Sequence, residues 1–417
     1  MSTSNVRRAA SSRPALRRCI AIEPDAFAEE YWGRGPLLTT SDELGEDFSD
    51  LLTLDTVDEL LSRRGLRTPF LRVAKDGKVV DASRFTRSGG AGAEIADQLA
   101  DDKLLGLFVD GSTLVLQGLH RVWPPLMAFA TQLADDLGHP VQINAYITPP
   151  QSQGFSAHYD VHDVFVLQIA GEKQWFIHEP VFESPLRSQP WNDRSTAVAE
   201  AATQAPVIDT VLRPGDALYL PRGYLHSAKA LGGVSVHLTV GIHPVTRYAL
   251  VEALLALAAD DLSLRTSLSL GVDLSDPKAV EPDLEATVSA LRRWLDDART
   301  EDVAARVRRR TWGATRPAPV SPLAQAAALR ALDADTSLHL RPHLRVAIDA
   351  MGDDLRLSFA DRNLTLPSST RPALDAVLSG AVLAAGSLPG LDEADSLVLA
   401  RRLLREALVV PAGAARY

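Results

Sequence analysis

Two histidines and one aspartate are candidate metal ligands. His158 and Asp160 are separated by one residue, and side chains at positions i and i+2 of a strand point to the same face. His226 comes much later, just after a predicted strand and a Pro-Arg-Gly turn that can return it to the same point. Two imidazoles and one carboxylate on a β framework are typical of non-haem Fe(II) centres, which keep coordination positions open for a co-substrate and dioxygen. The spacing therefore predicts an iron site.

Lys173 is a candidate for binding an acidic co-substrate. It follows Gly171-Glu172, a pair that predicts a two-residue hairpin between strands at 163–170 and 173–177. A lone lysine beside a turn is usually a solvated surface residue. Next to the His/Asp/His group, we interpret it as a cation that pairs with one end of a dicarboxylate whose other end binds iron.

The elements that must position these residues lie between about residues 140 and 245. Short apolar segments punctuated by Gly and Pro predict a β sandwich or barrel. The predicted strands are 141–148, 163–170, 173–177, 217–220 and 234–242. The preceding segment is mixed, with a strand at 113–117 and helices at 24–32, 56–64, 92–100 and 123–137.

The pattern becomes helical after residue 246, with helices predicted at 247–259, 283–299 and 301–310. A Pro-rich break then precedes a small α+β module with strands at 344–350 and 355–360 and helices at 370–379 and 393–407. We therefore expect four parts. They are a disordered basic tail (1–18), a catalytic domain (19–245), a helical region (246–322) and a C-terminal domain of the winged-helix kind (323–417).

Composition limits the partners. The chain has 417 residues, 46% of them hydrophobic, and a net charge of −10, which argues against a general binder of nucleic acids or anionic membranes. No apolar run is long enough for a membrane span. The C-terminal segment is slightly acidic, which favours a protein-contacting module over a DNA-binding wing. Cys19 is the sole cysteine, and we expect a reducing, cytoplasmic compartment.

Four stretches resemble one known family. Residues 144–175 contain His-Tyr-Asp at 158–160 and Gly-Glu-Lys-Gln-Trp at 171–175, and they resemble the JmjC-type ribosomal oxygenases, also called the cupin-4 family. Residues 27–38, 214–226 and 235–239 agree with the same family. The resemblance implies an α+β protein with a double-stranded β-helix (cupin/JmjC) core, a helical dimerisation region and a C-terminal winged-helix-like domain.

The resemblance also assigns roles to single residues. His158, Asp160 and His226 match the iron ligands, and Lys173 matches the residue that holds the distal carboxylate of 2-oxoglutarate. The other matches are Asn144 in the co-substrate pocket, His237 and Thr239 as co-substrate contacts, and two substrate-binding positions. These two are Tyr146 beside the target side chain and Gly241, where some members place a serine near the target residue. The family pattern requires no histidine at His162, so we expect His162 not to be a ligand.

The implied activity is that of an Fe(II)- and 2-oxoglutarate-dependent dioxygenase, which uses dioxygen to hydroxylate an arginine or histidine side chain of a ribosomal or other basic protein. Apolar surface on the helical region predicts a homodimer. Two alternatives stay open. One is the same chemistry on another peptide or a small metabolite, for which Gly241 leaves room. The other is a non-catalytic cupin and winged-helix regulator. The sequence does not distinguish hydroxylation from demethylation.

Overall fold

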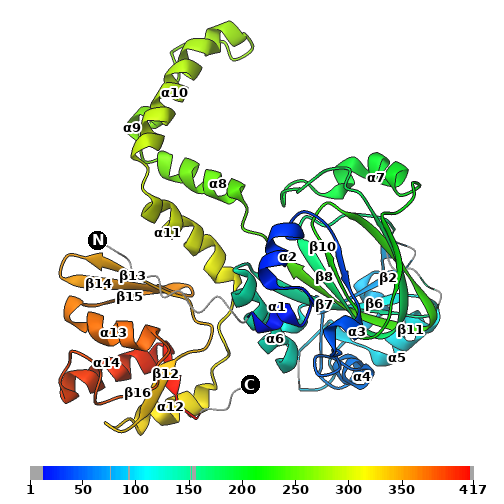
Figure 1. The fold of residues 1–417 in the computed structure, drawn as a ribbon, viewed down its shortest axis with the longest axis horizontal. Helices are drawn as coiled ribbons and strands as arrows, with labels where there is room; N and C mark the ends of the chain where they lie inside the picture. The colour runs from blue at the N-terminus through cyan, green and yellow to red at the C-terminus, as the bar shows by residue number, and fades with distance from the viewer. Residues whose placement is uncertain (1–12, 76, 93, 151, 153–155, 414–417) are drawn as a thin grey trace.

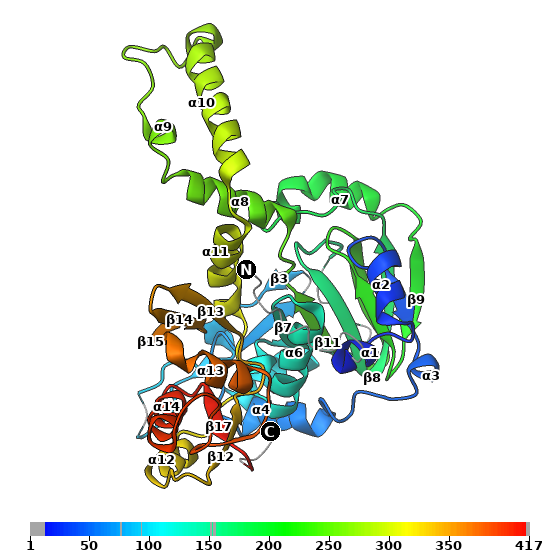
Figure 2. The same cartoon turned by 60° about the vertical axis from the view of Figure 1, so that its left-hand side comes forward.

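The computed structural model describes residues 13–413 except residues 76, 93, 151 and 153–155. Figure 1 shows a curved sheet with its helices on the right, a smaller C-terminal domain at lower left, and a helical arm that leaves the body between them. Figure 2 shows the same three parts from another side, with the arm extending away from both domains.

The site is carried by a nine-stranded sheet whose path is β1-β10-β8-β11-β7-β6-β2-β3, with β9 paired to β8. Its neighbouring strands are antiparallel. The strands are β1 (Leu37–Thr39), β2 (Leu71–Lys75), β3 (Lys78–Val79), β6 (Thr113–Leu116), β7 (Val141–Thr148), β8 (Asp163–His178), β9 (Ile208–Leu212), β10 (Ala217–Leu220) and β11 (Leu225–Ile242). Every second residue of β7 from Val141 to Ile147 is buried, which is the pattern of a strand with one face on the core. The strands predicted within 140–245 are present, but the region is not β throughout, because helix α7 (Ser195–Ala201) interrupts it.

The hairpin predicted at Gly171-Glu172 is wrong. Strand β8 runs without a turn from Asp163 to His178, and it pairs along most of its length with β11. Gly171 has φ +62°, and a Cβ there would lie 2.1 Å from the carbonyl oxygen of Val234. The register between β8 and β11 shifts between Leu231 and Val236. Gly171 therefore marks a strand irregularity where two backbones approach closely. Such an irregularity, like a hairpin turn, requires a glycine.

Helices cover the sheet from the N-terminal half. They are α1 (Pro14–Arg17), α2 (Pro24–Glu30), α3 (Ser41–Leu44), α4 (Leu54–Ser62), α5 (Asp101–Val109) and α6 (Pro124–Leu137), followed later by α7 (Ser195–Ala201). The helix predicted at 92–100 is wrong, because Gln98–Leu99 is the short strand β5, paired with β4 (Thr86–Arg87). The helix follows it instead, at α5.

The first folded domain includes residues that precede the boundary predicted at residue 19. In α1, the backbone N–H groups of Ala15 and Leu16 donate to the Asp136 carboxylate of α6 at 2.8 and 3.0 Å, and Leu16 is fully buried. Residues 13–18 thus belong to the domain built on the nine-stranded sheet, which we call the barrel domain. The rest of the predicted tail, residues 1–12, lies outside the described residues.

The arm and the C-terminal domain follow the barrel. The arm consists of α8 (Arg247–Ala258), α9 (Leu262–Arg265), α10 (Pro277–Asp297) and α11 (Thr300–Thr311). The C-terminal domain contains α12 (Pro322–Arg330), β12 (Ser337–Leu340), β13 (Val346–Met351), β14 (Asp354–Phe359), β15 (Arg362–Pro367), α13 (Arg371–Leu378), β16 (Leu383–Ala384), α14 (Glu393–Arg405) and β17 (Val409–Pro411). It has a hydrophobic core of its own, as a separate domain requires. The winged-helix likeness stays a prediction.

Within the described residues, no helix combines the length and the apolar character that a membrane crossing requires. Cys19 is a free, buried thiol. The cytoplasmic location stays a prediction.

Candidate metal centre

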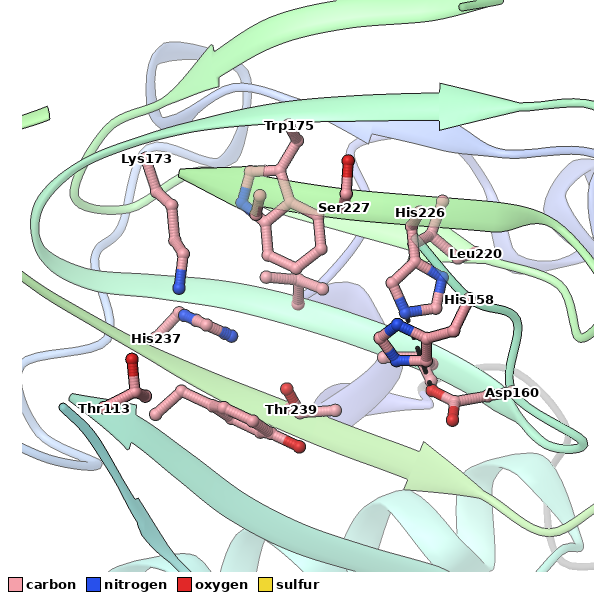
Figure 3. Close-up of a pocket in the computed structure, with 14 residues that line it drawn as sticks. Thr113, His158, Asp160, Lys173, Trp175, Leu220, His226, Ser227, His237 and Thr239 are labelled. Carbon is pink, nitrogen blue, oxygen red and sulfur yellow. Dashed lines mark ion pairs between the residues drawn. The ribbon is translucent and has the colours of Figure 1, made fainter. Parts of the chain in front are cut away.

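His158, Asp160 and His226 come together at one end of the barrel (Figure 3). One ligand atom from each residue can be chosen so that all three lie within 4.8 Å of one another. His226 Nε2 lies 3.8 Å from Asp160 Oδ2. The structure therefore brings the three predicted ligands to a common point, in the arrangement that a single metal ion needs.

Backbone pairing aligns the segments that carry these ligands. His158 and His226 form an isolated antiparallel bridge, with N···O distances of 3.2 and 2.8 Å. The segment 158–160 is not part of a regular strand as predicted, because only His158 forms a bridge and β8 begins at Asp163. Tyr159 is fully buried in a cluster with Val198 and Leu225. Tyr159 is thus in the core, whereas its neighbours His158 and Asp160 both line the site, as predicted for positions i and i+2.

The two imidazoles are oriented by backbone carbonyls. His158 Nδ1 lies 2.8 Å from the Ser156 carbonyl oxygen, and His226 Nδ1 lies 3.2 Å from that of Tyr224. A carbonyl oxygen only accepts, so Nδ1 carries the proton in each ring and Nε2 keeps its lone pair. Each imidazole is therefore held in the tautomer that can bind a metal through Nε2.

The charges of the group also suit a cation. Burial, with a contribution from His158, lowers the pKa of His226 to about 4, which keeps this ring neutral. Burial raises the pKa of Asp160, but the adjacent His162, His226 and His158 outweigh it and lower the pKa overall. An ionised carboxylate and a neutral imidazole are the forms in which these side chains bind metal ions. The donor set thus fits a divalent ion such as Fe(II).

Lys173 occupies the other end of the same pocket (Figure 3). It is 4% exposed, and its Nζ donates to Thr148 Oγ1 at 3.1 Å. No carboxylate of the described residues lies within ion-pair distance of it. Burial lowers the pKa of Lys173 to about 7. A buried ammonium without an acidic partner is costly, so this end of the pocket is suited to an anionic ligand.

The pocket between Lys173 and the triad has a volume of about 610 Å³ including its open mouth. Apolar side chains on β8 and β10 form part of its wall, namely Val164, Val166, Trp175 and Leu220. Two buried nitrogens at the pocket, Trp175 Nε1 and His237 Nδ1, have no hydrogen-bond partner among the described residues. The pocket therefore offers polar groups that a bound molecule can satisfy.

Three more of the predicted residues line this pocket. Tyr146 on β7 and His237 on β11 are direct cross-strand neighbours, and their rings stack with centroids 5.0 Å apart at 7°. Thr239 lies two residues further along β11, on the same strand face as His237. Burial, with a contribution from Lys173, lowers the pKa of His237 well below its usual value, so the ring is neutral. The roles predicted for these residues stay predictions.

The two remaining predicted residues are not among those that line the pocket. Asn144 lies opposite Thr239 in the β7–β11 pair, and its Oδ1 accepts a hydrogen bond from the Gly118 N–H at 3.0 Å. Gly241 packs against His162, and a Cβ at this position would come within 2.7 Å of the imidazole. The amide oxygen of Asn144 is thus already engaged, and His162 fills the space where a side chain at 241 would start.

The prediction from sequence missed several wall residues. Thr113 and Ser227 line the pocket, and Thr148 contacts the lysine. Thr113 and Thr148 are fully buried hydroxyl residues in strands β6 and β7, and their hydroxyl oxygens lie 3.4 Å apart. A threonine within an otherwise apolar strand was the available signal, but strand propensity alone explains it equally well.

Comparison with known proteins adds the following. Residues 125–250 match the model of the JmjC domain family. Ribosomal oxygenase 1 of Rattus norvegicus is 30% identical over 242 residues, which are 57% of this chain and 38% of the relative. The bifunctional lysine-specific demethylase and histidyl-hydroxylase NO66 of Drosophila persimilis is 39% identical over 139 residues, 32% of this chain and 19% of the relative. The predicted resemblance to JmjC-type ribosomal oxygenases is confirmed.

Solved structures agree on the fold. The Escherichia coli ribosomal oxygenase YcfD matches with a TM-score of 0.53 and 19% identity, covering 94% of this chain and 98% of that protein. The same protein has been solved in complex with cobalt and 2-oxoglutarate, and that structure matches with a TM-score of 0.50 and 18% identity. This chain spans 38% of the length of the rat relative.

Proposed function

We propose that this chain, which carries a JmjC domain at residues 125–250 and resembles the ribosomal oxygenases, is an Fe(II)- and 2-oxoglutarate-dependent protein hydroxylase. Its substrate in this proposal is an arginine or histidine side chain of a ribosomal protein. The observation that carries the proposal is the pairing, in one pocket, of a His/Asp/His group with a buried lysine that has no acidic partner among the described residues. A dicarboxylate can bind at one end to a metal ion held by the His/Asp/His group and at the other end to the buried lysine.

Each group has a distinct task in this reaction. Fe(II) at His158, Asp160 and His226 would supply the oxidation of a C–H bond to an alcohol by dioxygen, coupled to decarboxylation of 2-oxoglutarate to succinate. Lys173 donates to the far carboxylate of 2-oxoglutarate and so fixes its position along the pocket. The apolar wall of Val164, Val166 and Leu220 limits water near the reacting atoms.

Two comparisons support this assignment. The E. coli protein with the same fold binds cobalt and 2-oxoglutarate, and relatives that match over 242 residues are ribosomal oxygenases. The net charge of −10 also favours encounter with a basic ribosomal protein.

The proposal is tested by mass spectrometry of ribosomal proteins incubated with the purified chain, Fe(II) and 2-oxoglutarate. We expect one ribosomal protein to gain one oxygen atom, about 16 Da, and fragmentation to place it on an arginine or histidine. Asp160→Asn should abolish the gain. Asp209→Asn, which changes a carboxylate on β9 bonded to Gln174 outside the pocket, should leave it unchanged.

Other outcomes would point to the alternatives. Formation of succinate without any oxidised ribosomal protein would indicate another peptide or a metabolite as substrate. Absence of succinate with every substrate tried, even with excess iron, would contradict an oxygenase and favour a regulator.

We also propose that the helical arm forms a homodimer. Its helices expose large apolar side chains that the described residues do not cover: Tyr248, Leu250, Val251 and Leu255 on α8, and Leu284, Val288 and Leu295 on α10. The arm extends away from both domains (Figure 2). Apolar surface of this extent on a projecting element is typical of an interface, and a second copy of the arm offers a matching apolar surface.

A further inference from the structure

A second pocket lies where the barrel meets the segments that follow the arm. We call it the junction pocket, and the charged and imidazole side chains of its lining are His120, Arg121, Asp135, Arg316, His343 and Arg345. His120 and Arg121 precede α6, Asp135 belongs to α6, Arg316 lies between the arm and the C-terminal domain, and the last two precede β13. The volume is about 470 Å³, counted with its opening to solvent. Three parts of the chain thus converge on one polar cavity.

The junction pocket has an excess of positive charge. Three arginines face one carboxylate, that of Asp135. His343 Nδ1 donates to Asp135 Oδ2 at 2.6 Å, and Arg345 contacts Asp135 Oδ1 at 3.5 Å while donating to the Ala134 carbonyl at 3.0 Å. The aspartate is therefore already engaged by the residues of the C-terminal domain.

Among the described residues, the side chains of Arg121 and Arg316 have no acidic partner. Neither guanidinium group forms a salt bridge or a hydrogen bond there; Arg121 bonds only through its backbone N–H, to the Gly118 carbonyl at 2.8 Å. Both arginines line the same pocket, and Arg316 adds to burial in lowering the pKa of Arg121. Both arginines are exposed, so an anion can reach them from solvent, and it would offset the repulsion between their charges.

His120 adds a neutral donor to the same cavity. Its Nδ1 accepts the Ile143 N–H at 3.0 Å, so the proton of the ring is on Nε2. Burial, with contributions from Arg121 and Arg316, lowers the pKa of His120 to about 4, which keeps the ring neutral. Nε2–H finds no acceptor among the described residues. One imidazole N–H and two guanidinium groups are donors suited to an oxyanion.

We propose that the junction pocket binds a phosphate-class oxyanion, either inorganic phosphate or a phosphate monoester, between Arg121, Arg316 and His120. Arg121 belongs to the barrel and Arg316 to the segment that connects the arm with the C-terminal domain, so the bound anion joins them. Binding stabilises the position of the arm and the C-terminal domain against the barrel. The proposal does not depend on the oxygenase activity and is tested separately from it.

The test is titration of the full-length protein with sodium phosphate at a constant ionic strength set with sodium chloride. Calorimetry measures the binding, and thermal unfolding measures the change in Tm. We expect saturable binding and a rise in Tm of about 2–4 °C at saturation. Arg121→Gln and Arg316→Gln should each weaken the binding about tenfold or more. Arg213→Gln, an exposed arginine paired with Glu172 at 3.2 Å, should bind phosphate like the wild type.

The unliganded variants check their own folding. Removing one of two repelling arginines should leave the Tm in chloride unchanged or slightly higher, so that a loss of phosphate binding is not a loss of structure. Lys173→Met separates this pocket from the candidate active site, because it should leave phosphate binding intact. Phosphate binding that is absent, that is equal in wild type and both glutamine variants, or that disappears in Lys173→Met would overturn the proposal.

Discussion

Replacing Arg222 by methionine should weaken both the fold and the metal centre. Asp163, at the start of β8, is a buried carboxylate with 1% side-chain exposure. It accepts hydrogen bonds from Tyr219 Oη at 3.0 Å, from the Arg222 N–H at 3.0 Å and from Arg222 Nη1 at 3.3 Å. Arg222 also lies in the turn before His226, and the N–H of Gly223 in the same turn donates to the Asp160 carbonyl at 3.1 Å. The ion pair therefore fixes the turn that holds two of the ligands in place.

The size of the effect follows from the burial of the pair. Removing one partner of a buried ion pair costs about 3–5 kcal/mol of the free energy of unfolding. We expect the lower end, about 3 kcal/mol, because Tyr219 and the backbone N–H still donate to Asp163 after the change. Metal affinity should fall about tenfold or more, as for other residues that position metal ligands without touching the metal.

Urea unfolding of the metal-free protein measures the loss in the free energy of unfolding. Calorimetric titration with Mn(II) measures the loss in metal affinity. The matched control is Arg213→Met, whose exposed pair with Glu172 is worth about 0–1 kcal/mol. The double variant Arg222→Met with Asp163→Asn should regain part of the lost stability, because it leaves no unpaired charge buried. Equal losses in Arg222→Met and Arg213→Met, with Mn(II) affinity unchanged in both, would refute the reasoning.

Three further predictions concern the co-substrate, the strand irregularity and the arm. Lys173 has a pKa of about 7, so it loses its proton as the pH rises above 7. The affinity of the Mn(II)-loaded protein for 2-oxoglutarate should therefore fall roughly tenfold per pH unit above pH 7. Calorimetry should find this pH dependence in the wild type and none in Lys173→Met. Gly232→Ala should cost roughly 1–2 kcal/mol of the free energy of unfolding because of its positive φ. Gly171→Ala should cost clearly more, because Gly171 has a positive φ and, unlike Gly232, also meets a backbone atom within 4 Å. Equal urea midpoints for the two variants would contradict the close approach. Leu255→Glu, at a side chain 52% exposed on α8, should convert a dimer to a monomer in sedimentation experiments without changing the Tm of the barrel, and an unchanged mass would contradict the proposed interface.

The sequence was sufficient where local rules and side-chain chemistry agreed. Strand β7 has the predicted bounds, Val141–Thr148, because alternation and the following prolines both mark them. The clustering of His158, Asp160 and His226 was predictable because few residue types bind Fe(II) and positions i and i+2 can face one point. Lys173 was predicted as a candidate as well, although through a hairpin that does not exist.

The errors have physical causes. A glycine with positive φ in a strand irregularity has the same sequence signature as one in a hairpin, so Gly171 could not be assigned without the partner strand β11. The burial of α1 depends on Asp136, 120 residues away in the chain from Leu16, which local patterns do not reveal. The engagement of Asn144 by the Gly118 backbone is likewise a tertiary contact.

The central claim is that this pocket binds iron and 2-oxoglutarate. Its most direct test is to measure by NMR the conversion of 2-oxoglutarate to succinate by the purified chain, with and without added Fe(II). We predict turnover that requires Fe(II) and dioxygen and that is lost in His226→Ala, while the variant remains folded by circular dichroism. Succinate formation at the same rate in His226→Ala as in the wild type would contradict the assignment of this pocket as an iron- and 2-oxoglutarate-binding site.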